Sequence, residues 1–317
     1  MKAWLGKLLC GVTLGSALHF GASGGGAQAA PISGAFSGNT TVGQILAEPN
    51  FKGFARYLLP LEWRFDQNLQ LNEVAELLPY HNYVDPQLAV TILNELKIRA
   101  QQGEQVFYPL AKPCTGVFYF PGKPGAPTAI IAAGGGFIYV GSIHEGFPYA
   151  RYLNGLGYNA LVVHYRTGDM QAAGEDMAAA VGFMFEHAQE LKLDPHGYAL
   201  IGSSAGARMA AVVGAYGPEA LGQKAHEKAA AVIMAYTGYS QVSTLDRPTY
   251  MISGNRDGIA SYRVMARRAD TLNKINIPAQ FELAQGLPHG FGLGTGTKAQ
   301  DWLKRAAEFW QQQRSAH

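Results

Sequence analysis

The sequence predicts an α/β fold: a mostly parallel sheet of eight strands with helices on both faces, plus an N-terminal helical extension. Eight short apolar segments bounded by Gly, Pro or polar residues are expected as strands, at residues 105–108, 117–120, 128–133, 159–165, 198–201, 230–236, 249–253 and 279–283. Helical stretches alternate with the later strands, at residues 146–156, 175–191, 205–216, 261–274 and 299–312. This alternation requires crossover connections between parallel strands, whereas the first two strands form an antiparallel start.

The fifth expected strand runs into the pentapeptide Gly202-Ser203-Ser204-Ala205-Gly206, which fits the pattern G-x-S-x-G. An apolar, alanine-rich helix follows it at once. A sharp turn from strand to helix forces the central residue into strained backbone angles, and only small neighbours let the chain pass so closely. Ser204 is therefore expected to project its hydroxyl above the sheet as a nucleophile.

Three further loops at strand ends carry the residues that such a serine needs. The strand at 128–133 ends in Gly134-Gly135-Gly136, where backbone N–H groups can approach a developing oxyanion together with the N–H of Ala205. The strand at 249–253 is followed by Asp257, and the strand at 279–283 by His289. A neutral imidazole must accept the serine proton, and a carboxylate must fix its tautomer. The order Ser204, Asp257, His289 thus predicts a catalytic triad.

With these motifs the chain resembles the α/β-hydrolase superfamily of serine esterases and lipases, nearest to its hormone-sensitive-lipase-like and sugar-ester esterase branches. The resemblance covers residues 103–317, which it implies to be the catalytic domain. In the first branch the glycine motif reads H-G-G-G and its two later glycines donate, which implies Gly135 and Gly136 as oxyanion-hole donors. Ala133 stands in place of that histidine, so the loop is expected to be braced differently. Asp257 also lies in a shorter acidic motif than that branch has.

The resemblance implies a serine hydrolase that cleaves carboxylic esters through an acyl-enzyme intermediate. Aromatic and polar residues after the glycine loop, residues 137–147, are expected at the pocket rim and suit a short acyl group on a polar alcohol such as an acetylated sugar. Within them, His144 and Glu145 are interpreted as a solvated loop pair. Two alternatives stay open: a catalytically silent binding protein with this fold, and a peptidase of the same fold.

Residues 1–29 are expected to be a signal peptide, and they are set aside from the fold. Lys2 and Lys7 precede an apolar stretch, and Ala27-Gln28-Ala29 forms a small-x-small cleavage site. The mature chain is expected to be exported, periplasmic or secreted, without a stable membrane span. A net charge of +2, with no basic run, gives no indication of nucleic-acid binding. With no C-x-x-C or H-E-x-x-H motif, neither a metal nor another cofactor is expected.

Residues 30–102 are expected to form a separate helical segment. Apolar residues recur at helical spacing in residues 69–78, and Asp85-Pro86 predicts the start of a helix that continues to about Arg99. Only about a dozen residues separate the strands at 230–236 and 249–253, where many lipases insert a lid. The N-terminal segment is therefore a candidate lid, and the equal alternative is that its aromatic residues pack as ordinary core.

Overall fold

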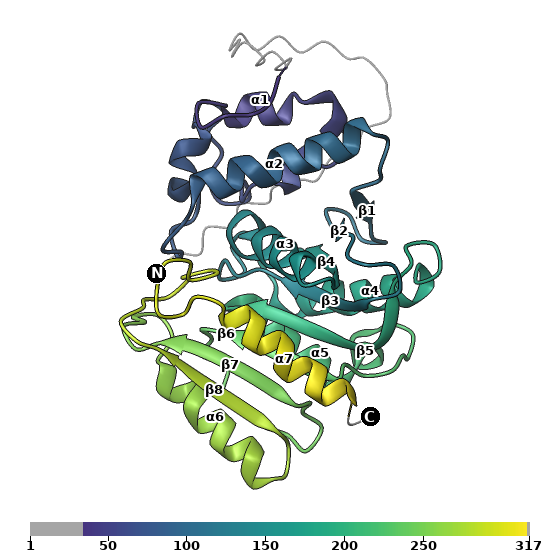
Figure 1. Cartoon of the computed structure of the whole chain (residues 1–317), viewed down its shortest axis with the longest axis vertical. Coiled ribbons are helices and arrows are strands. Elements are labelled where there is room, and N and C mark those ends of the chain that lie inside the picture. The colour runs from purple at the N-terminus through teal and green to yellow at the C-terminus, as the bar shows by residue number, and fades with distance from the viewer. Residues whose placement is uncertain (1–33, 316–317) are drawn as a thin grey trace, which may run out of the picture.

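The computed structural model describes residues 34–315 and contains one eight-stranded sheet (Figure 1). The strand order is β1-β2-β4-β3-β5-β6-β7-β8, in which β1 and β2 run antiparallel to their neighbours and all later pairs are parallel. This confirms the predicted fold class. The strands are β1 (Phe107–Pro109), β2 (Gly116–Phe120), β3 (Pro127–Ala132), β4 (Asn159–His164), β5 (Asp194–Ser203), β6 (Ala231–Ala235), β7 (Thr249–Gly254) and β8 (Ala279–Ala284). The expected leader lies outside the described residues.

Helices cover both faces of the sheet (Figure 1). One apolar cluster joins a face of the sheet to α2 (Pro86–Gln101), α3 (Phe147–Gly155) and α7 (Trp302–Ser315). A second cluster joins the other face to α4 (Met170–Glu186), α5 (Ala205–Tyr216) and α6 (Tyr262–Lys274). Central parallel strands are apolar on both sides because each side is covered in this way.

Two helices differ from the predicted bounds by several residues. Helix α4 was expected at 175–191 but begins at Met170, because the Asp169 carboxylate accepts hydrogen bonds from the backbone N–H groups of Gln171 and Ala172. Helix α7 lies about one turn later than expected, at Trp302–Ser315 instead of 299–312. By contrast, α5 has the predicted bounds.

The N-terminal segment packs against the sheet domain. It contains α1 (Val42–Leu46), α2 and short 3₁₀ turns at Pro49–Phe51, Ala55–Tyr57 and Leu71–Leu77. The predicted cap is present, since Asp85 accepts from the N–H groups of Gln87 and Leu88. Phe51, Leu58 and Leu59 are buried in the same cluster as α3 and α7, as the alternative of ordinary core packing requires. Part of the segment is exposed, including Phe65.

A short π-helical turn (Ser142–Gly146) leads into α3, and a 3₁₀ turn (Pro218–Leu221) follows α5. No helix among residues 34–315 combines the length and the apolar character needed to cross a bilayer.

Replacing Trp302 by Ala is expected to lower the free energy of unfolding by about 3–5 kcal/mol, because a large buried side chain is lost. Trp302 is fully buried, meets the Tyr149 ring edge-on at 5.4 Å, and donates its Nε1–H to the Gly292 carbonyl at 3.0 Å. The measurement is urea unfolding followed by circular dichroism. Ile98→Ala on α2, where the side chain is 52% exposed, should change the same free energy by no more than about 0.5 kcal/mol. Equal effects of the two substitutions would contradict this packing.

Candidate functional site

The backbone of Ser204 has φ 50° and ψ −112°, a strained conformation between the end of β5 and the start of α5. Glycines make this turn possible. A Cβ on Gly206 would collide with the carbonyl of Ala132 on β3, and one on Gly202 would collide with the backbone of Gly206. The α5 helix therefore crosses closely over β3, and Ser204 lies at the carboxyl edge of the parallel strands.

Ser204, His289 and Asp257 form a continuous hydrogen-bonded chain. His289 Nε2 lies 3.0 Å from Ser204 Oγ, and His289 Nδ1 lies 2.8 Å from Asp257 Oδ2. The other Asp257 oxygen accepts from the N–H groups of Ile259 and Ala260 at 2.8 and 2.7 Å. The Asp257 side chain is fully buried, and His289 is 4% exposed. In this arrangement Asp257 holds the Nδ1–H tautomer of His289, and the Nε2 lone pair faces the Ser204 hydroxyl.

The glycine loop after β3 turns tightly beside Ser204. Gly135 has φ 137° and Gly136 has φ 63°, both in the region that favours glycine. The Gly135 carbonyl accepts from the N–H groups of Ile138 and Tyr139, which closes the turn. Within residues 34–315, no hydrogen bond occupies the N–H of Gly135 or Gly136. Ala205 opens α5, where a backbone N–H has no partner inside the helix. The three predicted oxyanion donors thus lie on the glycine loop and at the first residue of α5, next to Ser204.

The structure corrects the interpretation of His144 and Glu145 as a solvated pair, and of residues 137–147 as a pocket rim. The Glu145 side chain is fully buried and His144 is 7% exposed. Tyr139, Ser142 and Phe147 are buried as well, so that only Phe137 and Ile138 of the expected rim residues reach the surface. The reason is that the segment folds into a π-helical turn beneath the glycine loop, where Glu145 Oε2 accepts from the Gly134 N–H at 2.6 Å.

Three consecutive residues of the N-terminal segment also reach the site, and sequence reasoning missed them. The Tyr80 ring lies over Gly136, and His81 Nε2 lies 3.1 Å from Glu145 Oε1. Asn82 donates its side-chain N–H to the His289 carbonyl and its backbone N–H to Gly290, both at 2.8 Å. No local motif marks these residues, because their partners lie about 60 to 200 positions further along the chain.

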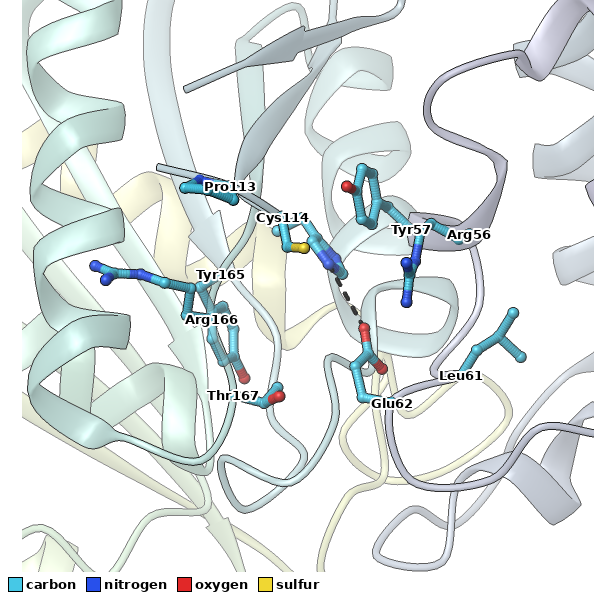
Figure 2. Close-up of a pocket in the computed structure, with 10 residues that line it drawn as sticks. Arg56, Tyr57, Leu61, Glu62, Pro113, Cys114, Tyr165, Arg166 and Thr167 are labelled. Carbon is cyan, nitrogen blue, oxygen red and sulfur yellow. Dashed lines mark ion pairs between the residues drawn. The ribbon is translucent and has the colours of Figure 1, made fainter. Parts of the chain in front are cut away.

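A separate cavity of about 300 Å³ lies between the N-terminal segment and the end of β4. Figure 2 shows Glu62 in its wall, with a dashed line for the 3.5 Å contact between Glu62 and His164. Burial raises the pKa of Glu62 from 4.5 to about 7, although hydrogen bonds from backbone N–H groups oppose the shift. Burial lowers the pKa of His164 to about 3, so this histidine is neutral near pH 7. No triad residue lines the cavity.

A family model described as BD-FAE matches residues 118–249. The chain is 22% identical over 232 residues to an acetylxylan esterase from Xylanibacter ruminicola, a match that covers 61% of this chain and 47% of that protein. The chain therefore spans about half the length of this curated relative.

Two solved structures share the fold. A propionate-bound thermophilic esterase from the planctomycete Thermogutta terrifontis is 20% identical, with a TM-score of 0.55 over 62% of this chain and 89% of that one. An α/β hydrolase enzyme, MGS-M1, from a Medee basin deep-sea metagenome library is 18% identical, with a TM-score of 0.57 over 66% of this chain and 98% of that one. With the sheet order described above, these likenesses show that the chain has the α/β-hydrolase fold.

The Glu62→Gln substitution is expected to raise the melting temperature at pH 8.5 by roughly 3 °C or more, and to have a smaller effect at pH 5. The folded-state pKa of Glu62 lies above its unfolded value, so its contribution to stability is present at low pH and is lost as the pH rises through about 7. Gln removes the cost of a buried charge at high pH. Differential scanning calorimetry at both pH values tests this, with Glu76→Gln on the exposed surface as the control. A gain at pH 5 equal to that at pH 8.5 would contradict the burial argument.

Proposed function

We propose that this chain hydrolyses carboxylic esters by nucleophilic catalysis, with Ser204 as nucleophile, His289 as general base and acid, and Asp257 as the orienting carboxylate. The observation that carries the proposal is the continuous hydrogen-bonded chain from Asp257 through His289 to Ser204, beside a loop with free glycine N–H groups. A serine hydroxyl is a weak nucleophile near neutral pH, and this geometry supplies the base that it needs. The likeness to an acetylxylan esterase adds support from an independent source.

In the proposed mechanism, Ser204 Oγ attacks the ester carbonyl while His289 Nε2 takes its proton. The carbonyl oxygen becomes an oxyanion, and the N–H groups of Gly135, Gly136 and Ala205 stabilise it. The tetrahedral intermediate collapses, and protonated His289 gives its proton to the departing alcohol, which leaves an acyl group on Ser204. Water, deprotonated by His289, then attacks the acyl-enzyme. The second tetrahedral intermediate collapses, the bond to Ser204 Oγ breaks, His289 returns the proton to that oxygen, and the acid is released. Asp257 stabilises the imidazolium in both half-reactions but stays ionised.

For the substrate we favour a short acyl group on a polar alcohol, such as an acetylated sugar. The partly exposed Phe137 directly follows the oxyanion loop, and the half-exposed Ile138 comes next. Phe137 also lines a neighbouring cavity of about 190 Å³, together with Arg208 and Met209 of α5 and Met170 of α4, whereas no triad residue lines it. A small mixed surface of this kind suits a short acyl chain better than a long one.

We further propose that the protein is exported, to the periplasm or beyond the cell, after cleavage near Ala29. The basic start, the apolar stretch and the small-x-small motif of residues 1–29 support this. N-terminal sequencing of the protein recovered from the periplasm and the medium tests the proposal, which an uncleaved, cytoplasmic chain would contradict.

A substrate panel separates ester hydrolysis from the remaining alternatives. Purified protein is tested on p-nitrophenyl esters of graded chain length, on acetylated xylo-oligosaccharides and on matched amides. We expect turnover of acetyl esters, a decline with acyl length, and no turnover of amides. Preferential turnover of amides would favour a peptidase, and binding without turnover of any ester would favour a silent binding protein.

The Ser204→Ala variant is expected to lose at least about 10³-fold in kcat/KM for acetyl esters while keeping the fold, because only the nucleophilic oxygen is removed. Steady-state kinetics measure the loss, and circular dichroism with thermal unfolding checks the fold. Hydrolysis at a rate close to that of the wild type would exclude Ser204 as the nucleophile.

The Gly135→Ala variant is expected to lower kcat by about 10²-fold with little change in KM, since oxyanion donors act mainly on the transition state. An added Cβ would collide with the Tyr139 carbonyl, and φ 137° is unfavourable for alanine, so the loop must move. Gly125→Ala, with positive φ on a distant turn and open space around it, is the matched control. An increase in KM at constant kcat would instead make the loop a wall of the pocket.

A further inference from the structure

A buried polar cluster lies beneath the catalytic loops, and the proposed reaction does not use it. We call it the Glu145 cluster, and its members are His81, Tyr139, Glu145, Tyr149, Ser203 and Tyr236. All six side chains are buried, although they come from the N-terminal segment, the glycine loop, the π-helical turn that follows it, α3, β5 and the end of β6. Buried polar groups are costly unless they are paired, so a cluster of this size calls for a functional explanation.

Glu145 is the acceptor on which the cluster converges. Its carboxylate accepts from the Gly134 N–H at 2.6 Å and from the Tyr236 hydroxyl at 2.7 Å, and it lies 3.1 Å from His81 Nε2. Burial by itself would raise the pKa of Glu145, but His81 and the other donors outweigh it and lower this pKa to about 2. Glu145 therefore carries a buried negative charge at all physiological pH values.

The hydroxyl groups of the cluster form a chain with a fixed direction. Each hydroxyl has one hydrogen, and that of Tyr236 goes to Glu145. Tyr236 must then accept from Tyr149 at 2.9 Å, and Tyr149 in turn accepts from the Ser203 hydroxyl at 3.1 Å. Ser203 directly precedes the proposed nucleophile. The carboxylate of Glu145 thus sets the orientation of groups as far away as the nucleophile turn.

The same cluster reaches the loop of the catalytic histidine. Tyr236 Oη accepts from the Gly292 N–H at 3.3 Å, and the Tyr236 ring meets the His289 ring edge-on at 5.1 Å. The neighbouring His144 donates its Nε2–H to the Gly290 carbonyl at 3.0 Å. On the other side, His81 Nδ1 lies 3.1 Å from the Tyr139 hydroxyl, which belongs to the glycine loop. One carboxylate is therefore linked to three of the four loops that the mechanism requires.

A negative charge so close to the oxyanion loop does not itself stabilise an oxyanion, because like charges repel. The donors that surround Glu145 instead stabilise its charge through hydrogen bonds. Its value to the site is geometric: the carboxylate fixes the Gly134 N–H and so the direction of the following glycines. His81 extends this bracing to the N-terminal segment. The braced glycine loop has Ala133 at the position where the hormone-sensitive-lipase-like branch has histidine.

We propose that Glu145, assisted by His81 and Tyr236, is a positioning residue that holds the oxyanion loop and the His289 loop in their reactive geometry. This inference rests on the proposed ester hydrolysis. The N-terminal segment is accordingly a part of the catalytic centre, which it joins through His81.

The first test is Glu145→Gln. Glutamine keeps the shape of the side chain, but one acceptor oxygen is replaced by an NH₂ donor that faces existing donors. We expect kcat for acetyl esters to fall by about 10²-fold, since small displacements of reacting groups have effects of this size, while KM stays within about threefold. Glu76→Gln, at an exposed ion pair of the N-terminal segment, is the matched control and should retain the wild-type kcat. A folded Glu145→Gln variant with the wild-type kcat would overturn the proposal, as would an increase in KM at constant kcat.

Tyr236→Phe serves where Glu145→Gln does not fold, because it removes one hydroxyl and keeps the ring beside His289. We expect kcat to fall by about tenfold at unchanged KM, and Tyr149→Phe, one step further along the chain, to have a smaller effect. Equal or absent effects of the two variants on kcat would overturn the proposal.

Hydrogen exchange measured by mass spectrometry, without substrate, separates this inference from the proposed function. In Glu145→Gln we expect faster exchange in residues 134–141 and 289–294 and unchanged exchange in β7 and α6. This outcome would support the bracing role even if the protein did not hydrolyse esters. Unchanged exchange in both loops would overturn it even if the protein did.

Discussion

The close crossing of α5 over β3 is the constraint on which the rest of the site depends. Gly206 brings the helix against the Ala132 carbonyl, and Ser204 takes up the resulting strain at φ 50°. Such strain persists only where the surroundings hold it in place. Here they are the covered parallel sheet on one side and the buried hydroxyl of Ser203, bonded to Tyr149, on the other. The Ser204 hydroxyl then lies at the edge of the sheet where β3, β7 and β8 end and the glycine, aspartate and histidine loops begin.

At that edge, two buried carboxylates have different roles. Asp257 accepts from backbone N–H groups of its own loop and is hydrogen-bonded to His289, which places its charge where an imidazolium would form in the proposed reaction. Glu145 lies below the glycine loop, and its carboxylate accepts hydrogen bonds from Tyr236 and Gly134 and lies 3.1 Å from His81 Nε2. The N-terminal segment contributes to the second arrangement and not to the first. In the proposed account its role is to support the loops around Ser204 and His289. Much of its apolar surface is buried in the core cluster of the sheet domain.

The sequence predicted the sheet and the α5 helix, and it singled out the three side chains that the structure joins by hydrogen bonds. Each has a local signature: apolar runs, a glycine-flanked serine, and polar residues at strand ends. It did not predict the burial of Glu145 or the role of His81. A charged pair in a loop is normally solvated, and only the distant donors at Tyr236 and His81 make burial of Glu145 favourable. Contacts across so many positions leave no periodic pattern. The start of α4 was missed for a simpler reason, since the capping Asp169 lies in a polar stretch that resembles a loop.

The central claim is that ester hydrolysis proceeds through an acyl group on Ser204, and trapping that intermediate tests it most directly. Enzyme mixed with an excess of p-nitrophenyl acetate is quenched in acid within milliseconds, digested, and analysed by mass spectrometry. The account predicts one acetyl group per chain, located on Ser204, with a burst of p-nitrophenol of matching size. An acetyl group on another residue, such as Ser203, would contradict it. Turnover at a steady rate with no burst and no adduct on Ser204, measured where deacylation is slow, would contradict it as well.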